Sequence, residues 1–215
     1  MTLRKLLWIL ASVAVAIAGY WWFNRAPHPV NLPPRATGPW VAFGDSLTEG
    51  YGASEGQAYP AILSRNLGVP ILNLGVAGDT TDGGLKRLDS LAEQSPRVVL
   101  LCLGGNDGLN QVPRSRTFGN LGTIIDRLHA EGSFVVLIGI RSASLRDSNK
   151  EHFARLAREK RVFYVPDMLR GIAFKPIYMS DAIHPNDEGY KRIAARLEKL
   201  LRPLLPQLNS NVPAR

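Results

Sequence analysis

The stretch Trp40-Val41-Ala42-Phe43-Gly44-Asp45-Ser46-Leu47 decides the fold of this chain. Its first four residues form a short apolar run, which is typical of a buried strand. The residues that follow, through Thr48-Glu49-Gly50-Tyr51-Gly52, have the glycines and small polar side chains of a turn. A serine at the carboxyl end of a first strand lies where open α/β sheets place their active sites. The stretch therefore predicts an α/β protein with Ser46 at its functional edge.

Beyond this stretch, apolar runs that predict strands alternate with segments that predict helices. Continuous apolar strands separated by helices are typical of a parallel sheet that is covered on both faces. We expect a three-layer α/β/α sandwich with a five-stranded, flavodoxin-like parallel sheet. The expected strands are 40–43, 71–74, 98–103, 134–138 and 162–165, and the expected helices are 58–67, 79–91, 118–130, 150–160 and 187–201.

Glycine-rich polar turns follow the first three expected strands. They read Gly44-Asp45-Ser46, Gly75-Val76-Ala77-Gly78-Asp79 and Gly104-Gly105-Asn106-Asp107. Because the carboxyl ends of parallel strands meet at one edge of a sheet, these turns are expected to converge. Their convergence predicts a site there.

A base and an acid for this site appear near the other end of the chain, in Asp181-Ala182-Ile183-His184-Pro185. A serine hydroxyl is a poor nucleophile until a base takes its proton. His184 suits that work because an unperturbed histidine has a pKa of about 6.5. Asp181 lies three residues earlier, so one loop can supply both groups, and a carboxylate there would fix the histidine tautomer. With Ser46, these are the three parts of an activated serine.

Four motifs in this order resemble those of the SGNH (GDSL-type) serine hydrolases. They are 44–47, 73–81, 104–109 and 181–185. Within that family the chain is most similar to the bacterial periplasmic thioesterase/lysophospholipase and arylesterase group. The resemblance covers residues 39–205, and it implies that Ser46 is the nucleophile, His184 the general base and Asp181 the group that orients the base.

The resemblance also implies an oxyanion hole. Its donors would be the backbone N–H of Ser46, the backbone N–H of Gly78 and the side-chain amide of Asn106, with Gly75 as the weaker alternative to Gly78. A glycine lets its N–H approach a substrate closely, and an amide donates a hydrogen bond without carrying charge. Leu47, Leu109 and Ile183 are candidate walls for the acyl group, although simple packing explains each of them equally well.

The activity implied by the resemblance is hydrolysis of small acyl esters, thioesters or lysophospholipids through an acyl-enzyme. Two alternatives stay open. A carbohydrate O-acetyl esterase of the cell envelope would use the same chemistry in a different cleft, and a binding module without activity could share the fold. The α/β-hydrolase fold is disfavoured, because Thr48 stands where the last glycine of Gly-x-Ser-x-Gly is required.

Composition and spacing argue against several other functions. No Gly-x-Gly-x-x-Gly follows the first strand and no cluster has metal-ligand spacing, so we expect no cofactor and no metal. The net charge is +8, but the body has no dense basic block, so no nucleic-acid partner is expected. Cys102 is the single cysteine and lies in an apolar run, which favours a core residue.

The N-terminus has the pattern expected of an export signal. Arg4-Lys5 precedes an uncharged apolar stretch of 18 residues, Leu6 to Phe23, which would be about 27 Å long as a helix against a hydrocarbon core of about 30 Å. Either an uncleaved signal anchor in the inner membrane or a peptide cleaved near Ala16-Ile17-Ala18 fits, and the uninterrupted apolar run favours the anchor. The body would then be periplasmic if the source is a Gram-negative bacterium.

Four segments follow from these observations. Residues 1–23 would be the signal anchor or signal peptide, 24–38 a proline-rich linker, 39–205 the hydrolase domain and 206–215 a C-terminal tail. We expect a monomer.

Overall fold

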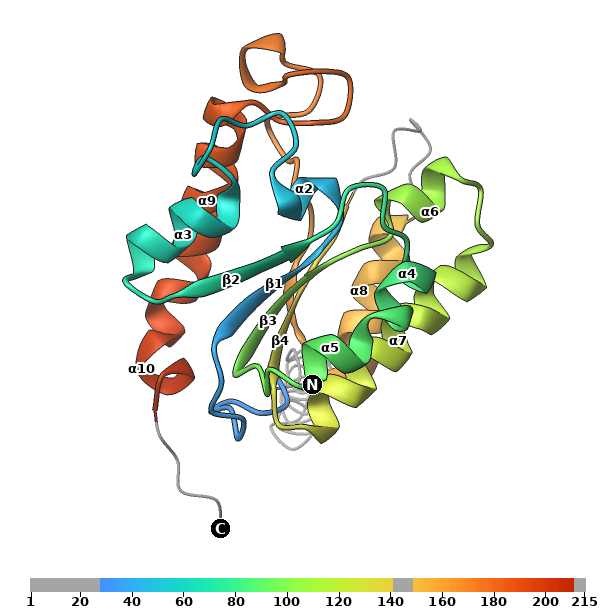
Figure 1. Ribbon diagram of the computed structural model, residues 1–215. Coiled ribbons are helices and arrows are strands. Elements are labelled where there is room, and N and C mark those ends of the chain that lie inside the picture. The colour runs from blue at the N-terminus through green and yellow to red at the C-terminus, as the bar shows by residue number, and fades with distance from the viewer. Residues whose placement is uncertain (1–27, 141–148, 211–215) are drawn as a thin grey trace, which may run out of the picture.

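The computed structural model describes residues 28–140 and 149–210. Its centre is a five-stranded parallel sheet in the order β2-β1-β3-β4-β5 (Figure 1). This is the strand order of flavodoxin-like proteins, so the predicted fold is confirmed. The strands are β1 (Trp40–Gly44), β2 (Ile71–Gly75), β3 (Val98–Cys102), β4 (Phe134–Ile138) and β5 (Phe163–Val165).

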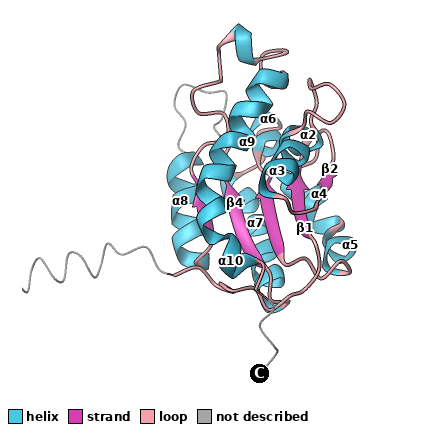
Figure 2. Cartoon of the chain, turned by 90° about the vertical axis from the view of Figure 1, so that its left-hand side faces the viewer, coloured by secondary structure: helices cyan, strands magenta, loops and turns pink. Residues whose placement is uncertain are grey.

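Helices cover both faces of the sheet (Figure 2). One face carries α3 (Tyr59–Leu67), α9 (Asp187–Leu201) and α10 (Leu205–Leu208). The other carries α4 (Thr81–Lys86), α5 (Leu88–Ala92), α7 (Arg114–Ala130) and α8 (Asn149–Lys160). Successive side chains of β1 enter the two layers in turn: Trp40 and Ala42 belong to the first core, and Val41 and Phe43 to the second. Short elements complete the chain: α2 (Ser46–Glu49), α6 (Gly105–Leu109), η1 (Pro176–Tyr178) and η2 (Arg202–Leu204).

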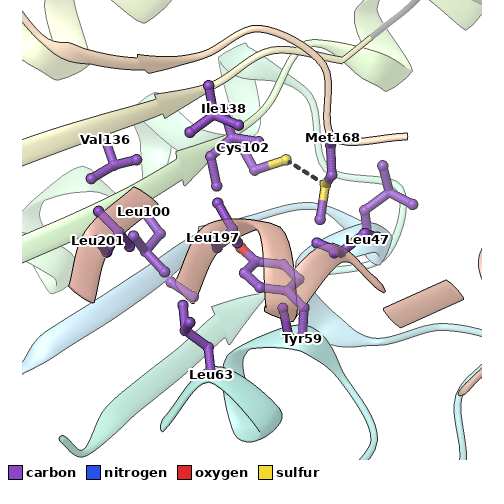
Figure 3. Close-up of a cluster of buried hydrophobic side chains, with 14 of the residues drawn as sticks. Leu47, Tyr59, Leu63, Leu100, Cys102, Val136, Ile138, Met168, Leu197 and Leu201 are labelled. Atoms are coloured by element: carbon purple, nitrogen blue, oxygen red, sulfur yellow. Dashed lines mark hydrogen bonds between the residues drawn. The ribbon is translucent and has the colours of Figure 1, made fainter. Parts of the chain in front are cut away.

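The core that contains Trp40 and Ala42 also contains Leu47, the residue after Ser46. Figure 3 shows Leu47 beside Tyr59 and Met168, with Cys102 close to Met168. The Tyr59 hydroxyl shares a hydrogen bond of 3.2 Å with Thr48 Oγ1, and Cys102 Sγ donates to Met168 Sδ over 3.3 Å. Burial raises the pKa of the Cys102 thiol well above its usual range, so this cysteine is an inert core residue, as its apolar strand predicted.

The structure differs from the expected elements in three places. The expected helix 79–91 is two short helices, because Arg87 leaves the helical conformation at φ −108° and ψ 15°. The expected helix 118–130 begins four residues earlier, immediately after Pro113. Strand β2 is only partly covered: Ile71 and Leu74 pack against the two cores, but β2 is an edge strand and Leu72 is 41% exposed.

Segments on either side of residues 39–205 pack against the domain. The Asn31 side-chain amide donates to the carbonyls of His129 and Ser133, each over 3.0 Å. At the other end Leu208 is fully buried, and Trp40 Nε1 donates to Asn209 Oδ1 over 3.2 Å. The ordered contacts therefore reach into both flanking segments.

No helix within 28–140 and 149–210 has the length and apolar character needed to cross a bilayer. The expected signal segment, residues 1–23, lies outside the described residues.

Candidate active site

A cleft of about 360 Å³ opens at the carboxyl edge of the sheet. Ser46 follows β1 and Asn106 follows β3, and both residues line this cleft. Strands β1 and β3 are neighbours whose chains continue on opposite sides, since β1 leads to β2 and β3 leads to β4. Ligands of open α/β sheets bind at such a switch point. The fold thus places Ser46 and Asn106 where a substrate is expected.

The turn after β1 fixes Ser46 as the first residue of α2. Asp45 is the N-cap of this short helix, and its Oδ1 accepts a hydrogen bond of 3.0 Å from the Leu47 N–H. Gly50 ends α2 in the left-handed conformation at φ 104°, and its N–H donates to the Ser46 carbonyl over 3.0 Å. Ser46 therefore lies in a single helical turn whose two ends are both fixed by hydrogen bonds. Of its surface, 8% is exposed.

Asp45 is a buried carboxyl group beside this serine, with 2% of its surface exposed. Burial raises its pKa to about 7, and the nearby carboxylates of Asp79 and Asp107 act in the same direction. The hydrogen bond from Leu47 opposes the shift. Near neutral pH, Asp45 therefore exists in both protonation states.

The structure brings Ser46, His184 and Asp181 together in one hydrogen-bonded chain. Ser46 Oγ lies 3.0 Å from His184 Nε2, and His184 Nδ1 lies 2.7 Å from Asp181 Oδ2. Oδ1 of Asp181 accepts from the backbone N–H groups of Ile183 and His184 over 2.8 and 2.7 Å. These bonds aim the carboxylate at the imidazole. The hydrogen bond with His184 is also the main reason why the pKa of Asp181 falls to about 2.

Local contacts hold the loop that carries His184. The His184 carbonyl accepts from the Ser180 N–H over 2.9 Å and from Ser180 Oγ over 3.1 Å. The ring of Tyr51 lies against the imidazole, with 4.5 Å between the ring centroids. Tyr51 is itself tied to α9, because Tyr190 Oη donates to its carbonyl over 2.9 Å. No sequence pattern pointed to Tyr51, because an aromatic residue in a turn is common.

Two of the three expected oxyanion donors line the cleft, namely Ser46 and Asn106. One hydrogen of the Asn106 amide is committed, because Nδ2 donates to the Asp79 carbonyl over 2.8 Å, which leaves the second hydrogen for a ligand. Gly78 has a positive φ of 78° and lies in an exposed turn outside the lining of the cleft. Neither the Ser46 N–H nor the Gly78 N–H has an acceptor within the described ranges.

Gly75 has a packing role that needs no ligand. A Cβ atom at this position would lie 2.1 Å from the backbone nitrogen of Glu49, so only glycine lets the end of β2 pass beneath α2. At Gly78 an added Cβ atom would meet nothing within 4 Å. Gly78 is therefore constrained by its backbone conformation and not by its neighbours.

Arg87 ties together the turns that carry the candidate donors, and the sequence did not reveal this role. Its guanidinium donates to the carbonyls of Gly44 and Leu74 over 3.0 and 2.8 Å, and to Asp79 Oδ2 over 2.8 Å. It also lies over the Phe43 ring, 4.1 Å from the centroid. The ends of β1 and β2 and the turn after β2 are thus joined by one side chain. A single arginine in a predicted helix gives no sequence signal for such contacts.

The buried Asp107 provides a second link between elements of the site. Its Oδ2 accepts from the Thr81 N–H over 2.9 Å, and its Oδ1 accepts from the hydroxyls of Thr81 and Thr117. These bonds join α6, which carries Asn106, to α4 and α7. The turns after β2 and β3 therefore form one rigid edge.

The cleft walls are largely apolar. Leu47, Leu109 and Ile183, the three expected wall residues, all line the cleft. Segment 166–180 supplies further wall residues that the sequence did not indicate, because it shows neither helical nor strand periodicity. The additional apolar lining consists of Ile140, Leu169, Ala173, Phe174, Met179 and Ala182.

In 28–140 and 149–210, no group of His, Cys, Asp and Glu side chains could hold a metal ion.

Comparisons with known proteins agree with this geometry. Residues 42–192 match the model of the GDSL-like lipase/acylhydrolase family. The chain is 32% identical over 177 residues to esterase TesA of Pseudomonas aeruginosa, covering 77% of this chain and 88% of that protein. It is 36% identical over 174 residues to thioesterase 1/protease 1/lysophospholipase L1 of Escherichia coli, covering 77% of this chain and 84% of that protein.

A crystal structure of TesA superposes with a TM-score of 0.72 at 30% identity, covering 77% of this chain and 99% of the other. The resemblance expected from the four motifs is thereby confirmed. The chain belongs to the GDSL-like lipase/acylhydrolase family and to the class of enzymes that hydrolyse ester bonds.

Proposed function

We propose that this protein is a serine esterase that hydrolyses acyl esters and thioesters through an acyl-enzyme on Ser46. The observation that carries the proposal is the hydrogen-bonded chain from Ser46 Oγ through His184 to Asp181. This is the arrangement that an activated serine requires: a nucleophile, a base within reach and a group that orients the base.

The reaction follows from these positions. Ser46 Oγ attacks the carbonyl carbon as its proton passes to His184 Nε2, and Asp181 stabilises the imidazolium that forms. Negative charge on the substrate oxygen is stabilised by the Ser46 N–H and the free amide hydrogen of Asn106, which both line the cleft, and the Gly78 N–H in the turn after β2 is the proposed third donor. The alcohol or thiol leaves with the proton from His184. Water then attacks the acyl-enzyme by the same route and releases the acid and Ser46.

The apolar lining of the cleft favours a substrate with an acyl chain over an acetylated sugar. Apart from Asp45, Ser46, Asn106, Gln111, Asn149 and His184, the side chains that line the cleft are apolar. Burial of apolar area stabilises a bound chain by about 25 cal/mol per Å². An acetyl ester would leave most of this apolar surface unused.

The test is the turnover of 4-nitrophenyl esters, from acetate to palmitate, by the full chain. We expect Ser46→Ala to reduce kcat by at least about 10⁴-fold on every active ester. Ser90→Ala is the matched control, since Ser90 is an exposed residue of α5 far from the cleft. Labelling of wild-type Ser46 by a fluorophosphonate should disappear in the same variant.

The length series separates the alternatives. An optimum at medium or long acyl chains supports the proposal, and a strong preference for acetate would favour a carbohydrate O-acetyl esterase instead. The absence of any Ser46-dependent turnover and of fluorophosphonate labelling would contradict catalysis and favour a binding module.

We also propose that the chain is exported and anchored by residues 1–23, with the hydrolase domain on the periplasmic side of the inner membrane. The support is the sequence alone: two basic residues followed by 18 apolar residues. The test is extraction of membranes with alkaline carbonate after expression of the full chain. Retention in the pellet at full length supports the anchor, and a shortened soluble product supports cleavage.

A further inference from the structure

The loop between β5 and α9, residues 166–186, projects beyond the carboxyl edge of the sheet in both views (Figure 1, Figure 2). It carries Asp181 and His184 on one side and forms part of the cleft wall. Its outer part, residues 170–178, includes the short helix η1. This outer part contributes Ala173 and Phe174 to the cleft lining, but its outward surface has no role in the proposed chemistry and needs a separate explanation.

Two large apolar side chains protrude from this outer part. Phe174 is 76% exposed and Ile177 is 69% exposed, the highest values for large apolar side chains within the described ranges. Phe174 has a positive φ of 62°, which is rare for a bulky aromatic residue. Phe174 also reaches the cleft lining, whereas Ile177 does not. A substrate in the cleft therefore leaves Ile177 unexplained.

Positive charge surrounds these two side chains. Arg170 and Lys175 are exposed, and residues 168–180 contain no acidic side chain. Arg192 of α9 adds a third cation, because its guanidinium lies 4.2 Å from the centre of the Tyr178 ring. None of these three cations forms an ion pair within the described ranges.

The acidic side chains nearest in sequence are engaged elsewhere. Asp167 accepts from the Leu169 N–H over 3.0 Å, Asp181 is bonded to His184, Asp187 accepts from the Ser54 N–H over 2.7 Å, and Glu188 pairs with Lys191 over 2.7 Å. The surface thus combines protruding apolar groups with free cations. This combination matches the interface of a membrane that contains anionic lipids, where apolar side chains insert and basic ones meet the headgroups.

We propose that residues 170–178 dock on an anionic lipid surface, with Phe174 and Ile177 inserted and Arg170, Lys175 and Arg192 among the headgroups. Docking in this orientation turns the mouth of the cleft toward the bilayer, because Phe174 belongs to both surfaces. The inference goes beyond ester hydrolysis, since it requires neither Ser46 nor His184.

The experiment places a polarity-sensitive fluorophore on Ile177→Cys in the full chain. Cys102 is fully buried, so the introduced thiol is the one that reacts. The apolar stretch of residues 6–23 can itself bind bilayers, and a probe on the loop separates loop docking from that attachment. Leu200→Cys is the control, because Leu200 is exposed on the C-terminal part of α9, away from the cleft.

We expect a blue shift at position 177, and none at position 200, on vesicles of phosphatidylcholine with phosphatidylglycerol. The shift should persist in Ser46→Ala, which keeps this test separate from that of catalysis. Lys175→Ala should weaken the docking equilibrium about fivefold, since one cation near an anionic surface contributes about that factor. Vesicles of phosphatidylcholine alone should give a smaller shift.

Three results would overturn the proposal. One is an equal shift at positions 177 and 200, and another is a shift at 177 that does not depend on lipid charge. The third is a shift without vesicles that grows with protein concentration, which would assign the surface to contacts between copies of the chain.

As a second readout, Ile177→Ser should lower turnover of an ester embedded in the anionic vesicles several-fold while turnover of soluble 4-nitrophenyl acetate stays unchanged. Leu200→Ser should change neither rate.

Discussion

The two halves of the candidate site are built very differently. Ser46 and Asn106 stand on turns that follow central strands, and the side chains of the partly buried Arg87 and the buried Asp107 bond these turns to the sheet and to each other. His184 and Asp181 stand on a projecting loop, and 44% of the Asp181 side chain is exposed. One half is fixed by the core, and the other is held by its own local hydrogen bonds.

Because of this difference, we expect the two halves to contribute differently to the stability of the fold and to catalysis. Groups that stabilise an oxyanion act best when they are preorganised and need not move during the reaction, which suits the turns after β1 and β3. A base must take a proton and then deliver it, so it needs a fixed tautomer more than a buried position. We therefore expect changes on the loop to affect catalysis alone, and changes under the turns to affect folding as well.

The largest effect is expected for Asp181→Asn. An asparagine cannot keep the His184 tautomer that accepts the Ser46 proton, so kcat should fall by up to about 10⁴-fold. Because Asp181 is half-exposed, the midpoint of urea unfolding should stay close to that of the wild type. Glu188→Gln, in an exposed pair with Lys191, is the control and should change neither quantity. A large loss of stability in Asp181→Asn would break the comparison.

Asn106→Ala should have the next largest effect. Loss of one oxyanion donor costs about 2.7–4 kcal/mol of transition-state stabilisation, or about 10²–10³-fold in kcat. It also leaves the Asp79 carbonyl without its donor, so a stability loss of about 1 kcal/mol should accompany it. Steady-state kinetics and urea unfolding measure the two effects. Asn110→Ala serves as the control, since Asn110 is exposed at the end of α6. A lower kcat/KM through a raised KM alone would assign Asn106 to substrate binding.

Arg87→Met tests the half of the site that is fixed by the core. The change removes three hydrogen bonds and leaves the Asp79 carboxylate, whose side chain is 8% exposed, without its partner. We expect the free energy of unfolding to fall by about 2–3 kcal/mol. A smaller loss of kcat should follow, because Asp79 positions Asn106. Arg127→Met removes a more exposed ion pair and should cost less than about 1 kcal/mol. Equal costs for the two variants would mean that Arg87 is no more than a surface residue.

The sequence predicted the sheet and most of its helices because the apolar runs were continuous and glycines marked their ends. Strand order followed from the family resemblance and the chain length. What the sequence missed depends on distant contacts. The break at Arg87 interrupts a leucine pattern that reads as one helix, and it falls at the residue whose side chain reaches carbonyls of two strands. Leu72 has the composition of a buried strand residue, and only the edge position of β2 exposes it.

The candidate site shows the same division. The sequence predicts Ser46 and Asn106 because their motifs place reactive side chains in turns at the ends of strands, and it predicts His184 because an acid lies three residues before it. Phe174 and Tyr51 were not found, because their positions in the cleft wall and beside His184 are set by the path of irregular segments. Periodicity carries no information about such segments. Residue type identified the chemistry, and packing decided which further side chains surround it.

Counted for each pH unit, the smallest expected effect is a pair of opposite pH dependences. Asp45, in the fixed half, has a raised pKa of about 7, so the folded state holds its proton more tightly than the unfolded chain. The free energy of unfolding should therefore fall as the pH rises from about 4 to about 7, by about 1 kcal/mol for each pH unit. Asp181, on the loop, has a pKa lowered to about 2, but its side chain is 44% exposed, so solvent screening keeps its contribution to stability small; that contribution is present above about pH 4 and is lost as the pH falls toward 2. Asparagine at position 45 can still cap α2, so Asp45→Asn should flatten the decline between pH 4 and 7 in urea unfolding, and Asp181→Asn should flatten only the acid limb. Identical profiles for wild type and Asp45→Asn would show that the carboxyl group beside Ser46 is solvated, and that the fixed half of the site is less closed to water than its contacts indicate.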